Sequence, residues 1–153
     1  KAMIILSGES VDCVQIQNLF AQVVQETAQL NPAFMNWTDA SIAQALDQYQ
    51  FRVILSGAHR AVAFICFQVT ADWLEILALG TLIEFQRQGY LKALLTSLAS
   101  ECSATSRNLT LEVHAQNQSA IELYQKCGFK TVRTRKNYYS DSGDAFVMNL
   151  SLI

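Results

Sequence analysis

With 153 residues, of which 51% are hydrophobic and 16% charged, the chain has the size and composition of one globular domain rather than of a disordered segment, and we predict a single domain over residues 1–153. Its formal net charge of −2 gives no electrostatic reason to expect a nucleic-acid partner. The longest apolar stretch, residues 73–83, contains a glutamate and a glycine, so we expect neither a membrane-spanning segment nor a membrane partner.

At the start of the chain, the apolar pattern predicts a short strand at 3–6, followed by two helices. Ser10 can cap the first helix, which ends at Asn31-Pro32 because a proline cannot continue a helix. Thr38-Asp39 begins the second, shorter helix.

The period of the apolar residues then changes to that of β-strands. Residues 51–55 and 61–69 are rich in branched and aromatic side chains and predict a hairpin that turns at Ser56-Gly57-Ala58. Residues 73–82 predict a third strand, which we expect to be covered on both faces because its side chains are almost all apolar.

Helices and strands alternate in the second half. An amphipathic helix follows Gly89 and leads to a strand at 109–113. The next helix opens with the capping box Ser119-x-x-Glu122 and ends at Gly128. The two closing strands are predicted at 129–134 and 145–152.

This order of elements predicts an α/β (α+β) fold. The strand–helix–strand crossover places the strands around Leu79 and Leu111 side by side and parallel. We therefore expect a mixed, mostly antiparallel sheet of about seven strands, with a central parallel pair and helices on both faces.

The cysteines and histidines argue against a metal site. The cysteines are Cys13, Cys66, Cys102 and Cys127. They form no C-x-x-C pair, and His59 and His114 are far apart in the chain, so we predict no metal. Apart from Cys13, the cysteines fall on apolar faces typical of buried free thiols, which fits a reducing compartment, the cytoplasm.

A polar loop with one glycine lies between an apolar strand and an amphipathic helix. It consists of Gln86, Arg87, Gln88, Gly89, Tyr90 and Leu91. Successive backbone N–H groups at the start of a helix suit a pyrophosphate, and Arg87 would add positive charge. The alternative is an ordinary strand-to-helix turn with Gly89 in a left-handed conformation, and the loop alone favours that alternative.

Two residues in the following strand and helix are candidates for acid–base chemistry. Glu112 is a lone carboxylate in the apolar strand 109–113, and both a solvated edge position and a general base remain open. Tyr124 has the spacing of a core residue, although its hydroxyl could also donate a proton. We expect His114 to point opposite Glu112, at the surface, and Asn117 to belong to the turn before the helix.

A pair of tyrosines, Tyr138 and Tyr139, precedes the last loop and the last strand. Tyrosines at the end of a strand can cap the core, and their hydroxyls can also hold the backbone of a bound peptide. The pattern leaves both roles open.

Together these motifs resemble the GCN5-related N-acetyltransferases, and within them the RimI-type enzymes that acetylate the N-terminal alanine of a ribosomal protein. The resemblance rests on Q-R-Q-G before a helix, on L-E-V-x-x-x-N-x-x-A-I-x-L-Y-x-x-x-G-F, and on N-Y-Y before a closing strand. It is strong from 74 to 150 and weaker around Trp37.

The resemblance implies acetyl-CoA as the cofactor and no metal. By analogy with the family, backbone groups of Leu79, Gly80 and Thr81 would hold the pantetheine arm and polarise the thioester carbonyl. The amides of residues 86–91 would take the pyrophosphate, and Asn117 matches a family contact to the cofactor.

The resemblance also implies roles in catalysis and in binding the acceptor. Glu112 matches the general base, and Tyr124 matches the acid that protonates the departing thiolate. Trp37, Tyr138 and Tyr139 resemble residues that line the acceptor slot. The implied reaction is direct transfer of an acetyl group to a protein N-terminal α-amine.

Two alternatives remain beside this function. The acceptor can be a small amine or a lysine side chain, or the chain can be a degenerate acyl-CoA-binding domain without catalysis. A peptide α-amine, with a pKa of about 7.7–8.0, is easier to deprotonate near neutral pH than a lysine, with a pKa of about 10.4, which favours the α-amine.

Overall fold

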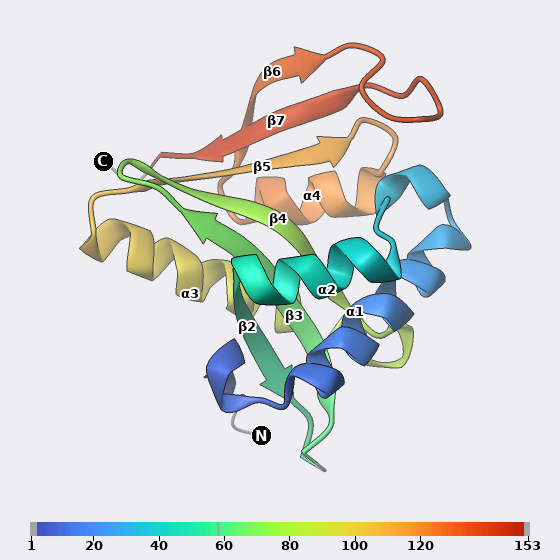
Figure 1. Ribbon diagram of the computed structural model, residues 1–153. Helices are drawn as coiled ribbons and strands as arrows, with labels where there is room; N and C mark the ends of the chain where they lie inside the picture. The colour runs from blue at the N-terminus through green and yellow to red at the C-terminus, as the bar shows by residue number, and fades with distance from the viewer. Residues whose placement is uncertain (1–2, 58, 152–153) are drawn as a thin grey trace. The chain divides into compact units, whose positions relative to one another are not determined.

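The computed structural model of the chain describes residues 3–57 and 59–151. In this part of the chain seven strands form one sheet in the order β1-β2-β3-β4-β5-β7-β6. Figure 1 labels β2 to β7. The strands are β1 (Ile5–Ser7), β2 (Gln50–Leu55), β3 (Ala61–Val69), β4 (Trp73–Thr81), β5 (Asn108–His114), β6 (Lys130–Arg135) and β7 (Ala145–Leu150). β4 and β5 pair in parallel, and the outer pairs are antiparallel, so the predicted mixed and mostly antiparallel sheet is confirmed.

Four α-helices and three short 3-10 helices are found among the described residues. The α-helices are α1 (Cys13–Ala28), α2 (Asp39–Gln48), α3 (Tyr90–Ala104) and α4 (Gln118–Lys126). The 3-10 helices are η1 (Gly8–Ser10), η2 (Pro32–Phe34) and η3 (Ile83–Phe85). None of the helices in the described part of the chain is both long and apolar enough to cross a membrane.

Two of the predicted helix caps are wrong, and one is confirmed. Ser10 ends η1, and the side chain of Asp12 caps α1 instead by accepting a hydrogen bond from Val14 N at 3.0 Å. α4 begins one residue before Ser119, which therefore lies inside the first turn and cannot cap it. Thr38 caps α2 in a reciprocal pair with Ser41.

The chain divides into two compact units. The first contains Lys1–Phe67 and Ala78–Leu94, and the second contains Gln68–Leu77 and Leu95–Ile153. In the first unit, the ring centroids of Phe20 in α1 and Phe64 in β3 lie 4.6 Å apart. This aromatic contact is part of a core in which every residue from 61 to 67 is buried. We predicted that the strand at 73–82, which is β4, would be buried on both faces, and this is wrong: buried and half-buried residues alternate along it. The strand buried on both faces is β3.

In the second unit, β5 pairs in parallel with β4 on one side and antiparallel with β7 on the other. Ile76 of β4 lies opposite Leu111, and Glu112 lies opposite Val147 of β7. β5, β7 and β6 run side by side in Figure 1, in yellow-orange to red. The predicted turn residue Ala58 and the predicted strand end at residue 152 lie outside the described residues.

We expect the free energy of unfolding to fall as the pH rises above 9, because Cys66 is buried in β3. Burial raises the pKa of this thiol from 9.0 to about 12, so the folded chain keeps a proton that the unfolded chain loses. Between these two values the loss is about 1.4 kcal/mol per pH unit from this group. Urea unfolding at pH 8, 9 and 10 should show a smaller fall for Cys66→Ala, and equally steep falls in both proteins would contradict the assignment.

Candidate active site

The predicted anion loop lies in the first unit, between η3 and α3. Gly89 has φ +83° and Arg87 has φ 63°, so the chain makes the left-handed turn that the sequence suggested. The first helical hydrogen bond runs from Ala93 N to Gly89 O at 3.0 Å. The N–H groups of the residues between them therefore have no acceptor within the helix, and they lie at the positive end of its dipole. The geometry is that of a turn and also that of an anion-binding helix start.

The loop is open at Gly89 and tied down at Gln86. No atom lies within 4 Å of the position that a Cβ would take at Gly89, and residues 86–89 are exposed. The amide of Gln86 donates a hydrogen bond from Nε2 to the backbone oxygen of Thr81 at 3.3 Å, and Thr81 is buried. Tyr90 and Leu91 are half-buried. Gln86 thus fixes the loop against the end of β4 and leaves its following amides accessible.

Gly80 in β4 packs directly against α1. A Cβ at this position would lie 2.3 Å from Cγ1 of Val23, a distance that no side chain can occupy without movement. Gly80 is buried, and Leu79 beside it is half-buried. The close packing of helix on strand explains why glycine, and no larger residue, stands at 80.

We expect Gly80→Ala to lower the free energy of unfolding by about 1–3 kcal/mol, the usual cost of overpacking a core. In a chain that also carries Val23→Ala, which removes the Cγ1 atom, the same change at 80 should cost much less. Urea unfolding of the four proteins of this double-mutant cycle measures the difference. Equal costs in both backgrounds would show that the contact with Val23 is not the cause.

Glu112 in β5 is the centre of a polar cluster in the second unit. Its side chain is 25% exposed, and Oε1 accepts a hydrogen bond from the hydroxyl of Tyr138 at 3.3 Å. Oε2 forms an ion pair with Arg135, whose Nε lies 2.5 Å away. Nevertheless Oε2 is shielded from solvent and accepts no hydrogen bond of good geometry from any described residue. Glu112 is thus a carboxylate with one oxygen beside the guanidinium of Arg135 and the other beside the hydroxyl of Tyr138.

Tyr124 in α4 has the burial of a core residue, and its role as a proton donor stays a prediction. Its ring is buried and lies 5.9 Å from that of Phe129, so it belongs to the core. Burial, with smaller contributions from Tyr139 and Cys127, raises the pKa of its phenol above the usual 10.0. The hydroxyl therefore stays protonated at neutral pH, as a proton donor must.

The two tyrosines before β7 lie at different depths. Tyr138 is half exposed, its ring faces Arg135, and the negative charge of Glu112 raises its pKa. Tyr139 stacks on the imidazole of His114, with 4.8 Å between ring centroids, and burial raises its pKa to about 12. The structure thus brings Tyr138 directly onto Glu112 and Tyr139 onto a neighbouring residue of the same strand.

The prediction for His114 is wrong. The residue is buried rather than at the surface, and its Nε2 lies 2.9 Å from Oδ2 of Asp141. Because alternate residues of a strand share a face, position 114 lies on the face of Glu112 and not opposite it. Period-two counting could have corrected this prediction, whereas the contacts of Arg135 and Asp141 depend on strand pairing and left no local signal.

Asn117 and Trp37 occupy ordinary structural positions. Asn117 precedes α4 and donates its backbone N–H to the oxygen of His114 at 2.9 Å, and its side chain does not cap the helix. Trp37 is half-buried in the first unit, and its ring centroid lies 4.9 Å from that of Phe20. Neither contact tests the roles that the resemblance implies for these residues.

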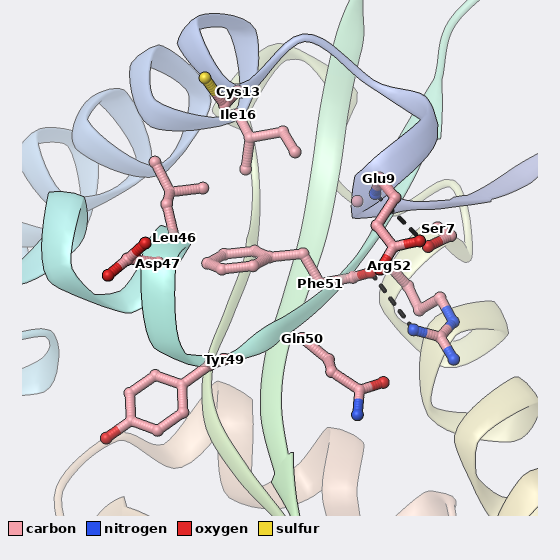
Figure 2. Close-up of a pocket in the computed structure, with 11 residues that line it drawn as sticks. Ser7, Glu9, Cys13, Ile16, Leu46, Asp47, Tyr49, Gln50, Phe51 and Arg52 are labelled. Carbon is pink, nitrogen blue, oxygen red and sulfur yellow. Dashed lines mark hydrogen bonds between the residues drawn. The ribbon is translucent and has the colours of Figure 1, made fainter.

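The described residues offer two further observations on binding sites. No group of three or more His, Cys, Asp or Glu side chains among them is placed to hold a metal ion. A cavity of about 310 Å³ opens in the first unit between the start of α1, the end of α2 and β2 (Figure 2). Cys13, Leu46 and Phe51 help to line it, and none of the predicted site residues does.

The similarity of the chain to known proteins agrees with the predicted motifs. The family model described as the acetyltransferase (GNAT) family matches residues 15–129. The [ribosomal protein bS18]-alanine N-acetyltransferase of Escherichia coli strain K12 is 31% identical over 120 residues, which are 76% of this chain and 81% of that protein. N-alpha-acetyltransferase 50 of Danio rerio is 36% identical over 100 residues, and the match spans only 60% of each protein.

The similarity extends to the fold. The crystal structure of the ribosomal-protein-S18-alanine N-acetyltransferase from Escherichia coli matches with a TM-score of 0.81 and 28% sequence identity, over 99% of this chain and 94% of that chain. The predicted fold class is therefore confirmed by comparison as well as by the strand order. Because the family model covers more than half of the residues, the chain belongs to the acetyltransferase (GNAT) family, whose members are acyltransferases that use acetyl-CoA, as the motifs predicted.

Proposed function

We propose that the chain transfers the acetyl group of acetyl-CoA to the N-terminal α-amine of a protein. The observation that carries the proposal is the polar cluster at Glu112, a partly buried carboxylate that pairs with Arg135 and accepts the hydroxyl of the half-exposed Tyr138. The relatives named above support the substrate class, since they are N-terminal acetyltransferases by name. An N-terminal alanine of a ribosomal protein is the first acceptor to test.

The reaction needs one group that removes a proton and one that supplies a proton. Glu112 takes a proton from the acceptor ammonium, directly or through one water, and the neutral amine attacks the thioester carbon. The C–N bond forms, the C–S bond breaks, and Tyr124 gives its proton to the departing thiolate. The nitrogen of the new amide loses its extra proton, which restores the phenol of Tyr124, so the proton that Glu112 took from the ammonium is the one released overall. Burial keeps the pKa of Tyr124 high, so its proton is present when the thiolate leaves.

Acetyl-CoA is held, in this proposal, by backbone groups rather than by a glycine-rich motif. Residues 86–91, in the loop before α3 and in its first turn, bind the pyrophosphate through backbone amides, and the open space around Gly89 fits such an approach. The N–H of Gln86 itself donates to the oxygen of Ile83 at 3.3 Å, so the amides after it supply the binding. Backbone groups of Leu79, Gly80 and Thr81 hold the pantetheine arm and polarise the thioester carbonyl. Asn117 contributes a further contact to the cofactor.

The acceptor is bound by aromatic side chains. Tyr138, half exposed and hydrogen-bonded to Glu112, is placed to meet a peptide beside the base. We assign Tyr139 to the same slot, and Trp37 to acceptor binding on the resemblance alone. We further propose that residues 1–153 act as a single acetyltransferase domain in the cytoplasm, with no nucleic-acid or membrane partner. The net charge of −2 and the four cysteines, present as thiols, agree with this proposal.

An assay of acceptors tests the function against its alternatives. Alanine-, serine- and methionine-initiated peptides and a set of polyamines are incubated with acetyl-CoA and analysed by mass spectrometry. The proposal predicts acetylation of at least one peptide and much slower modification of every polyamine. Modification of polyamines alone would move the chain to the small-amine class. Tight binding of acetyl-CoA by calorimetry without transfer to any amine would make it a binding domain.

A further inference from the structure

The loop that joins β6 to β7, residues 136–144, is fastened to the end of β5 by a buried histidine. We call these residues the tyrosine loop, because they include Tyr138 and Tyr139. The side chain of His114 is fully buried, and its Nε2 lies 2.9 Å from Oδ2 and 3.1 Å from Oδ1 of Asp141. A buried polar contact of this kind fixes the two backbones that carry it.

Both ring nitrogens of His114 are engaged, which sets its orientation. Gln116 donates its backbone N–H to Nδ1 at 3.1 Å, so Nδ1 acts as an acceptor. The ring proton therefore lies on Nε2, which donates to Asp141. The imidazole cannot turn without losing a hydrogen bond on one side or the other.

Gly143 connects Asp141 to the two tyrosines by backbone hydrogen bonds. The backbone N–H of Gly143 donates to Oδ1 of Asp141 at 2.8 Å. The oxygen of Gly143 accepts the backbone N–H groups of Tyr138 and Tyr139, at 3.0 and 3.1 Å. A Cβ at position 143 would lie 2.2 Å from Nε2 of His114, so only glycine allows this approach.

The side chains of the tyrosines complete the connection. Tyr139 stacks on the imidazole of His114, and Tyr138 donates its hydroxyl to Oε1 of Glu112. At its base the tyrosine loop has a second anchor, since Asp144 accepts the backbone N–H of Asn137, which lowers the pKa of that carboxyl. His114 and Asp141 thus hold the tip of the loop, independently of its base.

We infer that His114 and Asp141 are positioning residues that hold Tyr138 and Tyr139 in the arrangement that binds the acceptor. The inference rests on the proposed function, because it assigns the tyrosines to the acceptor slot. It adds that acceptor affinity depends on two residues that make no contact with the acceptor. Because Asp141 is one-third exposed at its side chain, its replacement can loosen the loop without emptying the core.

Two substitutions of Asp141 separate the hydrogen bonds from the charge. Asp141→Asn removes the charge and keeps Oδ1, which accepts from both Gly143 and His114, but it places an NH2 group where Oδ2 accepts from Nε2 of His114. Asp141→Ala removes the charge and both acceptors. We expect Asp141→Ala to raise the KM for an acceptor peptide at least about tenfold, with kcat and the KM for acetyl-CoA changed less than about threefold. Asp141→Asn, which keeps the bond from Gly143, should raise the peptide KM less than Asp141→Ala does.

Hydrogen exchange gives a second readout that does not depend on turnover. In Asp141→Ala the amides of Tyr138 and Tyr139 should exchange at least about tenfold faster than in Asp141→Asn, while the amides of β2 should be unchanged. An active wild type with the same peptide KM in Asp141→Ala would overturn the inference and leave the proposed function intact. A wild type that acetylates no amine would overturn the proposed function and the acceptor role with it. Faster exchange in that case would still show that the aspartate holds the loop.

Discussion

Glu112→Gln should lower kcat about 100-fold, in line with the usual contribution of a general base. Glutamine keeps the size and the hydrogen bond from Tyr138, but it cannot take a proton from the acceptor. In the wild type Oε2 is shielded from solvent and pairs with Arg135, and Oε1 accepts the hydroxyl of Tyr138. Steady-state kinetics with a peptide acceptor, together with calorimetry of acetyl-CoA binding, should show slow turnover and unchanged cofactor affinity.

The matched control is Glu75→Gln, in the neighbouring strand β4. Glu75 already accepts a hydrogen bond from Gln68 at 2.5 Å, and a glutamine oxygen can accept the same bond. The kcat of Glu75→Gln should stay within about threefold of the wild-type value. If Glu112→Gln turns over as fast as Glu75→Gln, another group removes the proton and the assignment of Glu112 fails.

Tyr124→Phe should lower kcat at least about tenfold without raising the KM for either substrate, because only the proton donor is removed. The phenylalanine ring can keep the contact with Phe129, so the melting temperature should change little. Since burial raises the pKa of Tyr124 above 10.0, the wild-type rate should show no alkaline decline from this group below about pH 10.

A second tyrosine serves as the control for Tyr124. Tyr49 is half-buried in the first unit and has no predicted role, so Tyr49→Phe should leave both kcat and KM unchanged. A Tyr124→Phe enzyme with wild-type turnover from pH 6 to pH 9 would show that the thiolate leaves unprotonated or takes its proton from water.

The sequence predicted the fold where local patterns determine it. Apolar periodicity located the strands and helices, and the crossover between β4 and β5 required those strands to be parallel. The two wrong caps have a local cause. Ser10 and Ser119 have the right residue type, but Ser10 is the last residue of the 3-10 helix η1, and α4 begins one residue before Ser119.

The candidate site was predicted less completely, because its contacts join segments far apart in the chain. Glu112 and Tyr124 stand out by type and spacing within one strand and one helix. Glu112 contacts Arg135 and Tyr138, which lie more than 20 positions later in the chain, at the end of β6 and in the loop before β7. These contacts depend on the pairing of β5 with β7 and of β7 with β6. The contact of His114 with Asp141 spans 27 positions and depends on the same pairing.

The most direct test of the central claim uses one peptide that offers both kinds of amine. The peptide begins with a free alanine, contains one internal lysine, and is incubated with acetyl-CoA and the wild-type chain. Fragmentation in the mass spectrometer then locates the acetyl group. Transfer to a protein α-amine predicts acetylation of the N-terminal nitrogen, with the lysine unmodified. Acetylation of the lysine with a free N-terminus, or no acetylation of the peptide at any concentration, would contradict it.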